Sequence, residues 1–129
     1  MMPNEMKTPS PAGETPVDFE QLRSAAGDDA GFLQELADLY FAQAGEIMPA
    51  LSAALEKRSA AEVNYLAHRL VGASLSCGMS AMVSPLRELE KRGHSGDLSG
   101  ADEFLARAAA NLEIVRAAMQ AYLRQGGRG

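Results

Sequence analysis

The chain has 129 residues and a formal net charge of −5. Its length suits a single domain, and its acidic balance argues against a nucleic-acid or anionic-membrane partner, because such surfaces are bound by clustered Lys and Arg. Hydrophobic residues make up 47% of the chain and aromatic residues 5%, which favours packed helices. The lone Cys77 cannot form an internal disulfide, and no segment reaches the ~20 consecutive apolar residues of a membrane span. We therefore expect a cytoplasmic helical domain with a protein partner.

The N-terminal segment changes character after its first 16 residues. Residues 1–16 contain four of the six prolines and no pattern that would bury a face, which predicts a flexible leader. Thr15 followed by Pro16 resembles an N-cap with proline at the first helical position. This pair predicts a short helix that ends at about Ser24, before a break at Gly27-Asp28.

The second predicted helix extends from about Asp29 to Lys57. Apolar side chains recur in it at helical spacing, at Phe32, Leu33, Leu36, Leu39, Tyr40, Ile47, Leu51 and Leu55. Gly45 and Pro49 lie inside the segment, and proline removes a helical hydrogen bond and crowds the preceding turn. A kink or a break is therefore expected near them.

Two further helices are predicted before Gly96. Ser59 and Glu62 match a capping box, which predicts a helix start there, and Gly78 predicts the end of that helix at about Cys77. The fourth helix carries apolar side chains and an early proline, and two glycines are expected to end it. These residues are Met82, Val83, Leu86 and Leu89, with Pro85, and the glycines are Gly93 and Gly96.

The last predicted helix begins at a second capping-box pattern, from Ser99 to Asp102. Its apolar stripe is the most regular in the chain, at Phe104, Leu105, Ala108, Leu112, Val115, Met119 and Tyr122. Residues 125–129 are glycine-rich and predict a flexible tail. Long amphipathic helices joined by short loops bury their stripes together. The predicted fold of residues 17–124 is therefore all-α, an antiparallel bundle of three to four long helices preceded by a short one.

Motifs of several enzyme classes are absent from the sequence. It contains no glycine-rich phosphate loop, no pair of Cys or His at metal-ligand spacing and no nucleophile elbow around a serine. These absences exclude an ATP-dependent kinase, a zinc site and a hydrolase of the familiar kinds. We interpret His94 as a solvated residue of the expected Gly93–Gly96 turn, and Cys77 as a buried, inert thiol.

His68 differs from these residues because of its place on the third predicted helix. At 100° per residue it lies about 150° from the centre of the apolar sector, which consists of Val63, Leu66, Ala67, Leu70, Ser74 and Cys77. Small or apolar residues flank it on the outer face, at Asn64, Val71, Gly72 and Leu75. An exposed imidazole in such surroundings indicates a docking surface, and a neutral imidazole nitrogen can accept a phosphoryl group. The pattern is equally compatible with an accidental surface histidine.

Gly72 lies one turn after His68 in the same helix. Glycine in a helix interior costs roughly 1 kcal/mol relative to alanine. Its missing side chain would let another molecule approach the imidazole closely, which favours the docking interpretation.

The third and fourth predicted helices resemble the signature of histidine-containing phosphotransfer (HPt) domains. The resemblance covers nearly all of residues 17–124 and rests on the run Ala67-His68-Arg69-Leu70-Val71-Gly72-Ala73-Ser74, on Gly78, and on Leu86-Arg87-Glu88-Leu89-Glu90. It implies an antiparallel four-helix bundle with a short additional N-terminal helix, in which His68 is the phosphoacceptor and Gly72 clears space for the partner. It also implies that the partners are response-regulator receiver domains and a hybrid histidine kinase. The reactive aspartate and Mg²⁺ would belong to the receiver, and no cofactor is expected on this chain.

The sequence departs from the family pattern at Val71, where the family usually carries lysine. Valine cannot make charge-assisted hydrogen bonds to phosphoryl oxygens, so Arg69 or Arg87 would have to substitute for the lysine. Two functions remain open. The first is a phosphorelay intermediate that accepts a phosphoryl group on His68 from one receiver and passes it to another. The second is a non-phosphorylated docking or adaptor bundle for receiver or kinase partners. We expect a monomer, because a bundle can close its core alone.

Overall fold

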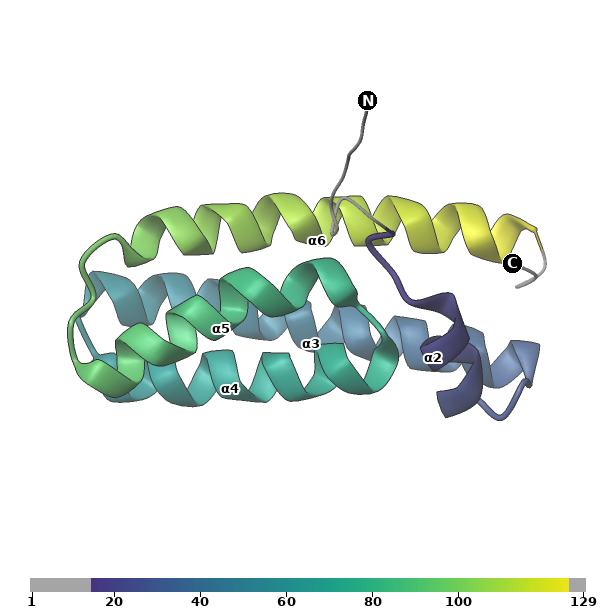
Figure 1. The fold of residues 1–129 in the computed structure, drawn as a ribbon, viewed down its shortest axis with the longest axis horizontal. Coiled ribbons are helices and arrows are strands. Elements are labelled where there is room, and N and C mark those ends of the chain that lie inside the picture. Colours follow the sequence, from purple (N-terminus) through teal and green to yellow (C-terminus); the bar gives the residue numbers. More distant parts are fainter. Residues whose placement is uncertain (1–14, 126–129) are drawn as a thin grey trace, which may run out of the picture.

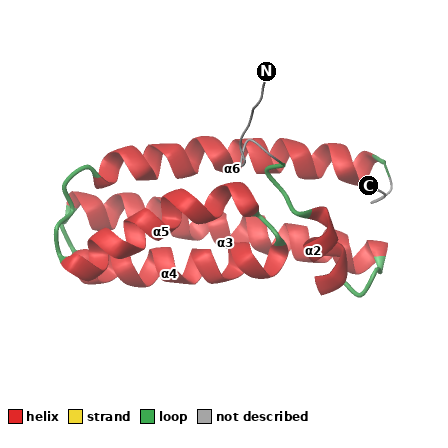
Figure 2. Cartoon of the chain, in the orientation of Figure 1, coloured by secondary structure: helices red, strands yellow, loops and turns green. Residues whose placement is uncertain are grey.

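The structure, a computed structural model, describes residues 15–125 and consists there of helices without strands (Figures 1 and 2). The predicted all-α fold class is confirmed. Figure 1 shows α3 and α6 along the length of the bundle, α4 and α5 side by side over one part of it, and α2 at the other end. Most of the predicted leader 1–16 and tail 125–129 lies outside the described residues. The helices are α2 (Phe19–Ala25), α3 (Ala30–Glu56), α4 (Ala60–Cys77), α5 (Ser80–Ser95) and α6 (Ala101–Arg124).

The first helix starts later than the sequence predicts. Its N-cap is Asp18, whose side chain accepts a hydrogen bond from the Gln21 amide at 3.1 Å, so the assignment of Thr15 as the cap is wrong. The residues before α2 instead hydrogen-bond to the α4–α5 turn. The Asp18 amide donates to the Gly78 carbonyl at 2.6 Å, and the Pro16 carbonyl accepts from the Ala81 amide at 3.0 Å. These backbone bonds to a distant turn hold the segment in a non-helical conformation.

Of the kink or break expected in the second helix, the break does not occur, and α3 continues through Pro49. Proline has no amide to donate to the carbonyl four residues earlier, which belongs to Gly45. The lost hydrogen bond is offset because Ile47 and Leu51, on either side of Pro49, are buried in the core. Tertiary packing therefore outweighs the local helix-breaking signal.

Glycines end two of the helices, although not all of the predicted caps form. Gly78 ends α4 and Gly96 ends α5, each in the left-handed region with φ of 74° and 85°. Ser59 is the N-cap of α4, as predicted, but its side chain makes no capping hydrogen bond. The expected capping partner, Glu62, forms an ion pair with Lys57 at 3.1 Å instead. The N-cap of α6 is Gly100, so the second predicted capping box is also wrong.

Gly93 does not end α5 but lies buried within it. His94 consequently belongs to the last turn of α5 rather than to a loop, although it is exposed as predicted. Glycine at this position is explained by a close approach of the α4 backbone.

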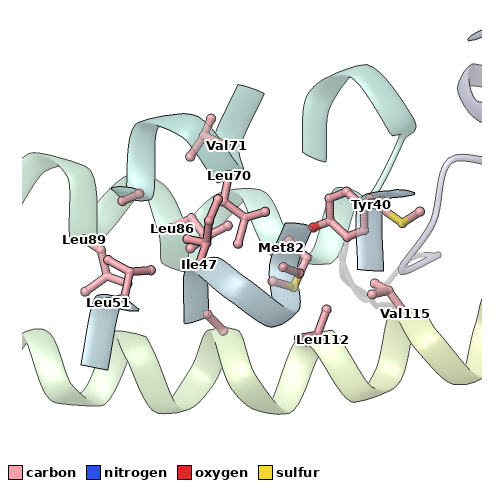
Figure 3. Packing of buried hydrophobic residues seen from close by; sticks show 14 of the residues in the cluster. Tyr40, Ile47, Leu51, Leu70, Val71, Met82, Leu86, Leu89, Leu112 and Val115 are labelled. Carbon is pink, nitrogen blue, oxygen red and sulfur yellow. The ribbon is translucent and has the colours of Figure 1, made fainter. Parts of the chain in front are cut away.

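The core lies between α3, α4, α5 and α6, and each contributes a row of buried side chains. Figure 3 shows these side chains converging, among them Ile47, Leu51, Leu70, Met82, Leu86, Leu89, Leu112 and Val115. One polar pair lies inside, where the Tyr40 hydroxyl and Ser74 Oγ are 2.7 Å apart. Burial raises the pKa of Tyr40 to about 12. The Cys77 thiol is half-buried, and burial raises its pKa as well, which makes it a poor nucleophile.

Candidate functional site

His68 lies on the outer face of α4, with 73% of its side chain exposed. Four residues of the predicted apolar sector are buried beneath it, namely Val63, Ala67, Leu70 and Ser74. The remaining two, Leu66 and Cys77, are half-buried. The helical period therefore separates the imidazole from the core, as predicted, and leaves the ring accessible to a partner.

Glu90 on α5 contacts the His68 ring directly. The His68 Nδ1 and Glu90 Oε2 atoms are 2.6 Å apart, and 24% of the Glu90 side chain is exposed. A carboxylate can only accept a hydrogen bond, so Nδ1 carries the ring proton and its N–H donates a hydrogen bond to Glu90. In the neutral ring the lone pair then lies on Nε2. The contact thus selects the nitrogen that can act as a nucleophile.

Glu90 is not predicted as a site residue from the sequence, where it belongs only to the Leu-Glu pair of the family signature. Its contact with His68 joins residues 22 positions apart on two helices connected by a turn. A helical wheel describes one helix at a time and contains no signal for such a contact.

Asn64 also contacts Glu90, so its placement on the open surface needs correction. The Asn64 Nδ2 atom donates to the Glu90 carbonyl at 2.9 Å, and the side chain is half-buried between the two helices. Asn64, Glu90, Lys91 and His94 line a hollow of about 250 Å³, and His68 is not among its lining residues.

Val71 does not lie on the outer surface, contrary to the prediction. It is only 4% exposed and belongs to the hydrophobic core, as Figure 3 shows. The prediction assumed one apolar sector about 100° wide, whereas α4 packs against both α3 and α5. The second neighbour widens the buried arc so that it includes Val71.

The remaining predicted surface residues are accessible. Gly72 is exposed, and a Cβ atom built on it meets nothing within 4 Å. Leu75 is 49% exposed, and Tyr65, which the sequence analysis missed, is 61% exposed. Tyr65 precedes His68 by one turn, as Gly72 follows it, so the spacing could have revealed it. We call the surface formed by Tyr65, His68, Gly72 and Leu75 the docking face.

The two candidate cations differ in their placement. Arg69 lies over the Tyr65 ring, with its Cζ atom 5.7 Å from the ring centroid. Arg87 is exposed on α5, three residues before Glu90, and residues at this spacing share a helix face. Arg87 therefore flanks the carboxylate that contacts His68.

Within residues 15–125, no three His, Cys, Asp or Glu side chains gather as a metal-binding group. In the same residues, no helix is both long and apolar enough to cross a membrane.

Comparisons with known proteins identify the family. The Hpt domain family model matches residues 35–125, a range that includes His68 and Glu90. A crystal structure of histidine-containing phosphotransfer protein B (HptB) from Pseudomonas aeruginosa PAO1 is similar in fold, with a TM-score of 0.80 at 22% identity over 87% of this chain and 97% of that one. Among curated proteins, no match was found. The chain belongs to the histidine-containing phosphotransfer domain family.

Proposed function

We propose that this chain is a phosphorelay intermediate that accepts a phosphoryl group on His68 from a receiver-domain aspartate and passes it to another receiver domain. Membership of the phosphotransfer family supports the carrier role. The observation that carries the assignment to His68 is its hydrogen bond to Glu90. That bond occupies Nδ1 and leaves Nε2 as the exposed nucleophile.

The transfer step follows from this arrangement. The Nε2 lone pair attacks the phosphorus of an aspartyl phosphate, an N–P bond forms, and the P–O bond to the aspartate breaks. The aspartate leaves as a carboxylate, and the ring, now substituted on Nε2 and protonated on Nδ1, carries a positive charge. Glu90 stabilises that charge through a charge-assisted hydrogen bond. Attack by a second receiver's carboxylate on the same phosphorus reverses the sequence and restores the neutral ring.

The chain needs no nucleotide site or cofactor of its own for these steps. Mg²⁺ would be held by the receiver, where it neutralises phosphoryl oxygens. The docking face supplies apolar contact area around the acceptor, with Tyr65 and Leu75 on either side of it. Receiver domains and a hybrid histidine kinase are the proposed partners. We further propose that the chain is a cytoplasmic monomer that binds neither nucleic acid nor membrane.

The alternative, a docking or adaptor bundle without phosphorylation, draws its support from Val71. This side chain is buried where the family usually carries lysine, so the usual cation beside the phosphate is missing. Arg87 is the better-placed substitute, because it shares a helix face with Glu90. Both functions use the docking face, and they differ only in whether His68 is modified.

Phosphoryl uptake from phosphorylated receiver domains separates the two functions. The chain contains only two histidines, His68 and His94, and both are exposed on neighbouring helices, so His94→Gln is a matched control for His68→Gln. We expect acid-labile, base-stable label in the wild type and in His94→Gln, and none in His68→Gln. Label that persists in His68→Gln would assign the acceptor elsewhere. A wild type that binds receivers but takes up no label from any of them would favour the adaptor.

A further inference from the structure

The backbones of α4 and α5 touch at Gly93. A Cβ atom at this position would lie 2.8 Å from the Ala60 carbonyl oxygen and from the Asn64 Cα, and closer still to the Asn64 amide nitrogen. All three are backbone atoms of α4, so no flexible side chain can move aside. Only glycine permits this separation of the two helices.

A side chain of α4 bonds across the same crossing. Asn64 donates from Nδ2 to the Glu90 carbonyl at 2.9 Å. Glu90 precedes Gly93 by one turn of α5, and Asn64 precedes His68 by one turn of α4. The backbone contact, the cross-helix hydrogen bond and the Glu90–His68 contact therefore lie within one turn of one another on both helices.

We propose that Gly93 and Asn64 are positioning residues, which set the distance between α4 and α5 at which the Glu90 carboxylate reaches His68 Nδ1. Neither contacts the phosphoryl group. Gly93 fixes the helix separation, and Asn64 fixes the rotation and register of Glu90 against α4. Because the two atoms are 2.6 Å apart and hydrogen bonds of this kind usually extend to about 3.2 Å, a displacement of α5 by less than 1 Å weakens the hold on the ring.

This inference rests on the proposed function for its biological meaning, but its structural content is independent of phosphorylation. If Gly93 and Asn64 serve only the packing of the bundle, their substitution lowers stability and leaves the His68 ring unchanged. If they position Glu90, the same substitutions change which ring nitrogen carries the proton. The tautomer of His68 is therefore the readout that separates the two roles.

The test measures nitrogen NMR shifts of the neutral His68 ring in the full chain, with Gly93→Ala and Asn64→Ala as the variants. We expect the wild type to hold its proton on Nδ1. Both variants should move toward the mixture of tautomers of an unrestrained imidazole, as Glu90→Ala should, because alanine removes the acceptor itself. Phosphoryl uptake should slow by roughly tenfold or more, because small misplacements of reacting groups are costly.

Two controls match the variants in kind. Gly45→Ala alters another helical glycine, whose added Cβ meets nothing within 4 Å. Asn111→Ala removes a similar bond, from Asn111 Nδ2 to the Ala81 carbonyl at 2.7 Å, between α6 and α5. Both controls should keep the wild-type tautomer. If Gly93→Ala does not fold, the His68 tautomer of Asn64→Ala is by itself the test of the proposal.

An unchanged tautomer in a folded Asn64→Ala, or a change equal to that in Asn111→Ala, would overturn the proposal. Failure of the proposed function would look different. In that case the wild type would take up no label while its His68 ring still carried the Nδ1 proton and the variants still lost it.

Discussion

Two glycines lie inside neighbouring helices, and their surroundings are opposite. Gly93 of α5 is buried, and α4 backbone atoms occupy the space that a side chain would need. Gly72 of α4 is exposed, and a Cβ atom there would meet nothing. The fold of this chain therefore requires the first glycine but not the second, although both carry the same cost in helix propensity. Gly45 of α3 is likewise exposed and unconstrained, so what links Gly72 to a partner is its place on the docking face, one turn from His68.

The boundary between the core and the docking face lies between Val71 and Gly72, which are adjacent in the sequence. Val71 is 4% exposed, and Gly72, the next residue, is exposed. Substitutions at these two positions should therefore change the free energy of unfolding in opposite directions. Measuring both changes tests where the core ends.

Val71→Lys should have the largest effect on stability and should lower the free energy of unfolding by roughly 1–3 kcal/mol, because it places an ammonium group in an apolar site. Val71→Met, which is similar to lysine in length but carries no charge, should cost less than Val71→Lys. Urea denaturation of both variants checks this. If Val71→Lys is as stable as the wild type, the core does not extend to this flank of α4 in solution.

Tyr40→Phe should cost about 1–2 kcal/mol, because it leaves the buried Ser74 hydroxyl without its partner. Tyr65→Phe on the docking face should change stability by less than about 0.5 kcal/mol. Thermal unfolding of the two variants compares the same chemical change in the core and on the surface. Equal effects would contradict the assignment of Tyr40 to the core.

Alkaline pH adds a second test of the same tyrosine. An unfolded tyrosine ionises near a pKa of about 10, and burial raises the pKa of Tyr40 to about 12 in the folded chain. Between these values the unfolded chain releases the proton and the folded chain keeps it, so stability falls as pH rises. Tyr40→Phe should flatten that fall between about pH 10 and 12. An unchanged slope would show that Tyr40 is not the group responsible.

Gly72→Gln should raise stability by roughly 0.5–1 kcal/mol through better helix propensity and reduced entropy of the unfolded chain. If Gly72 keeps the approach to His68 open for a receiver, the same substitution should slow phosphoryl transfer. The thermal midpoint and the transfer rate are to be measured on the same preparation. A stabilised variant with an unchanged rate would remove Gly72 from the docking face.

Leu75→Ala should have the smallest effect on the fold, within about 0.5 kcal/mol, because its side chain is already half exposed. A receiver that covers the docking face would bury this side chain, so we expect weaker receiver binding by calorimetry. Ile114→Ala on α6 is the control, since Ile114 is 51% exposed on a helix outside the docking face. Equal binding by all three proteins would exclude Leu75 from the interface.

Local signals in the sequence were sufficient for several features of the fold. Gly78 ends α4 and Gly96 ends α5 because each takes a left-handed conformation that glycine adopts without strain. His68 faces away from the apolar sector because the period of a helix depends only on its own residues. These features need no information from other parts of the chain.

Tertiary structure decided the features that depend on where a second helix lies. Val71 is buried, Asn64 is a bridge and Glu90 is the partner of His68, all because α5 packs against one flank of α4. In the sequence Gly93 predicts the end of a helix, yet it lies within α5. Glycine is needed there because the α4 backbone leaves no room for a side chain. The sequence alone determined the helices, the ends of α4 and α5 at Gly78 and Gly96, and the exposed histidine, since these follow from short-range periodicity and left-handed glycine caps. The nitrogen of that histidine available for chemistry is set by a contact between residues 22 positions apart, which only the packing of α5 on α4 creates.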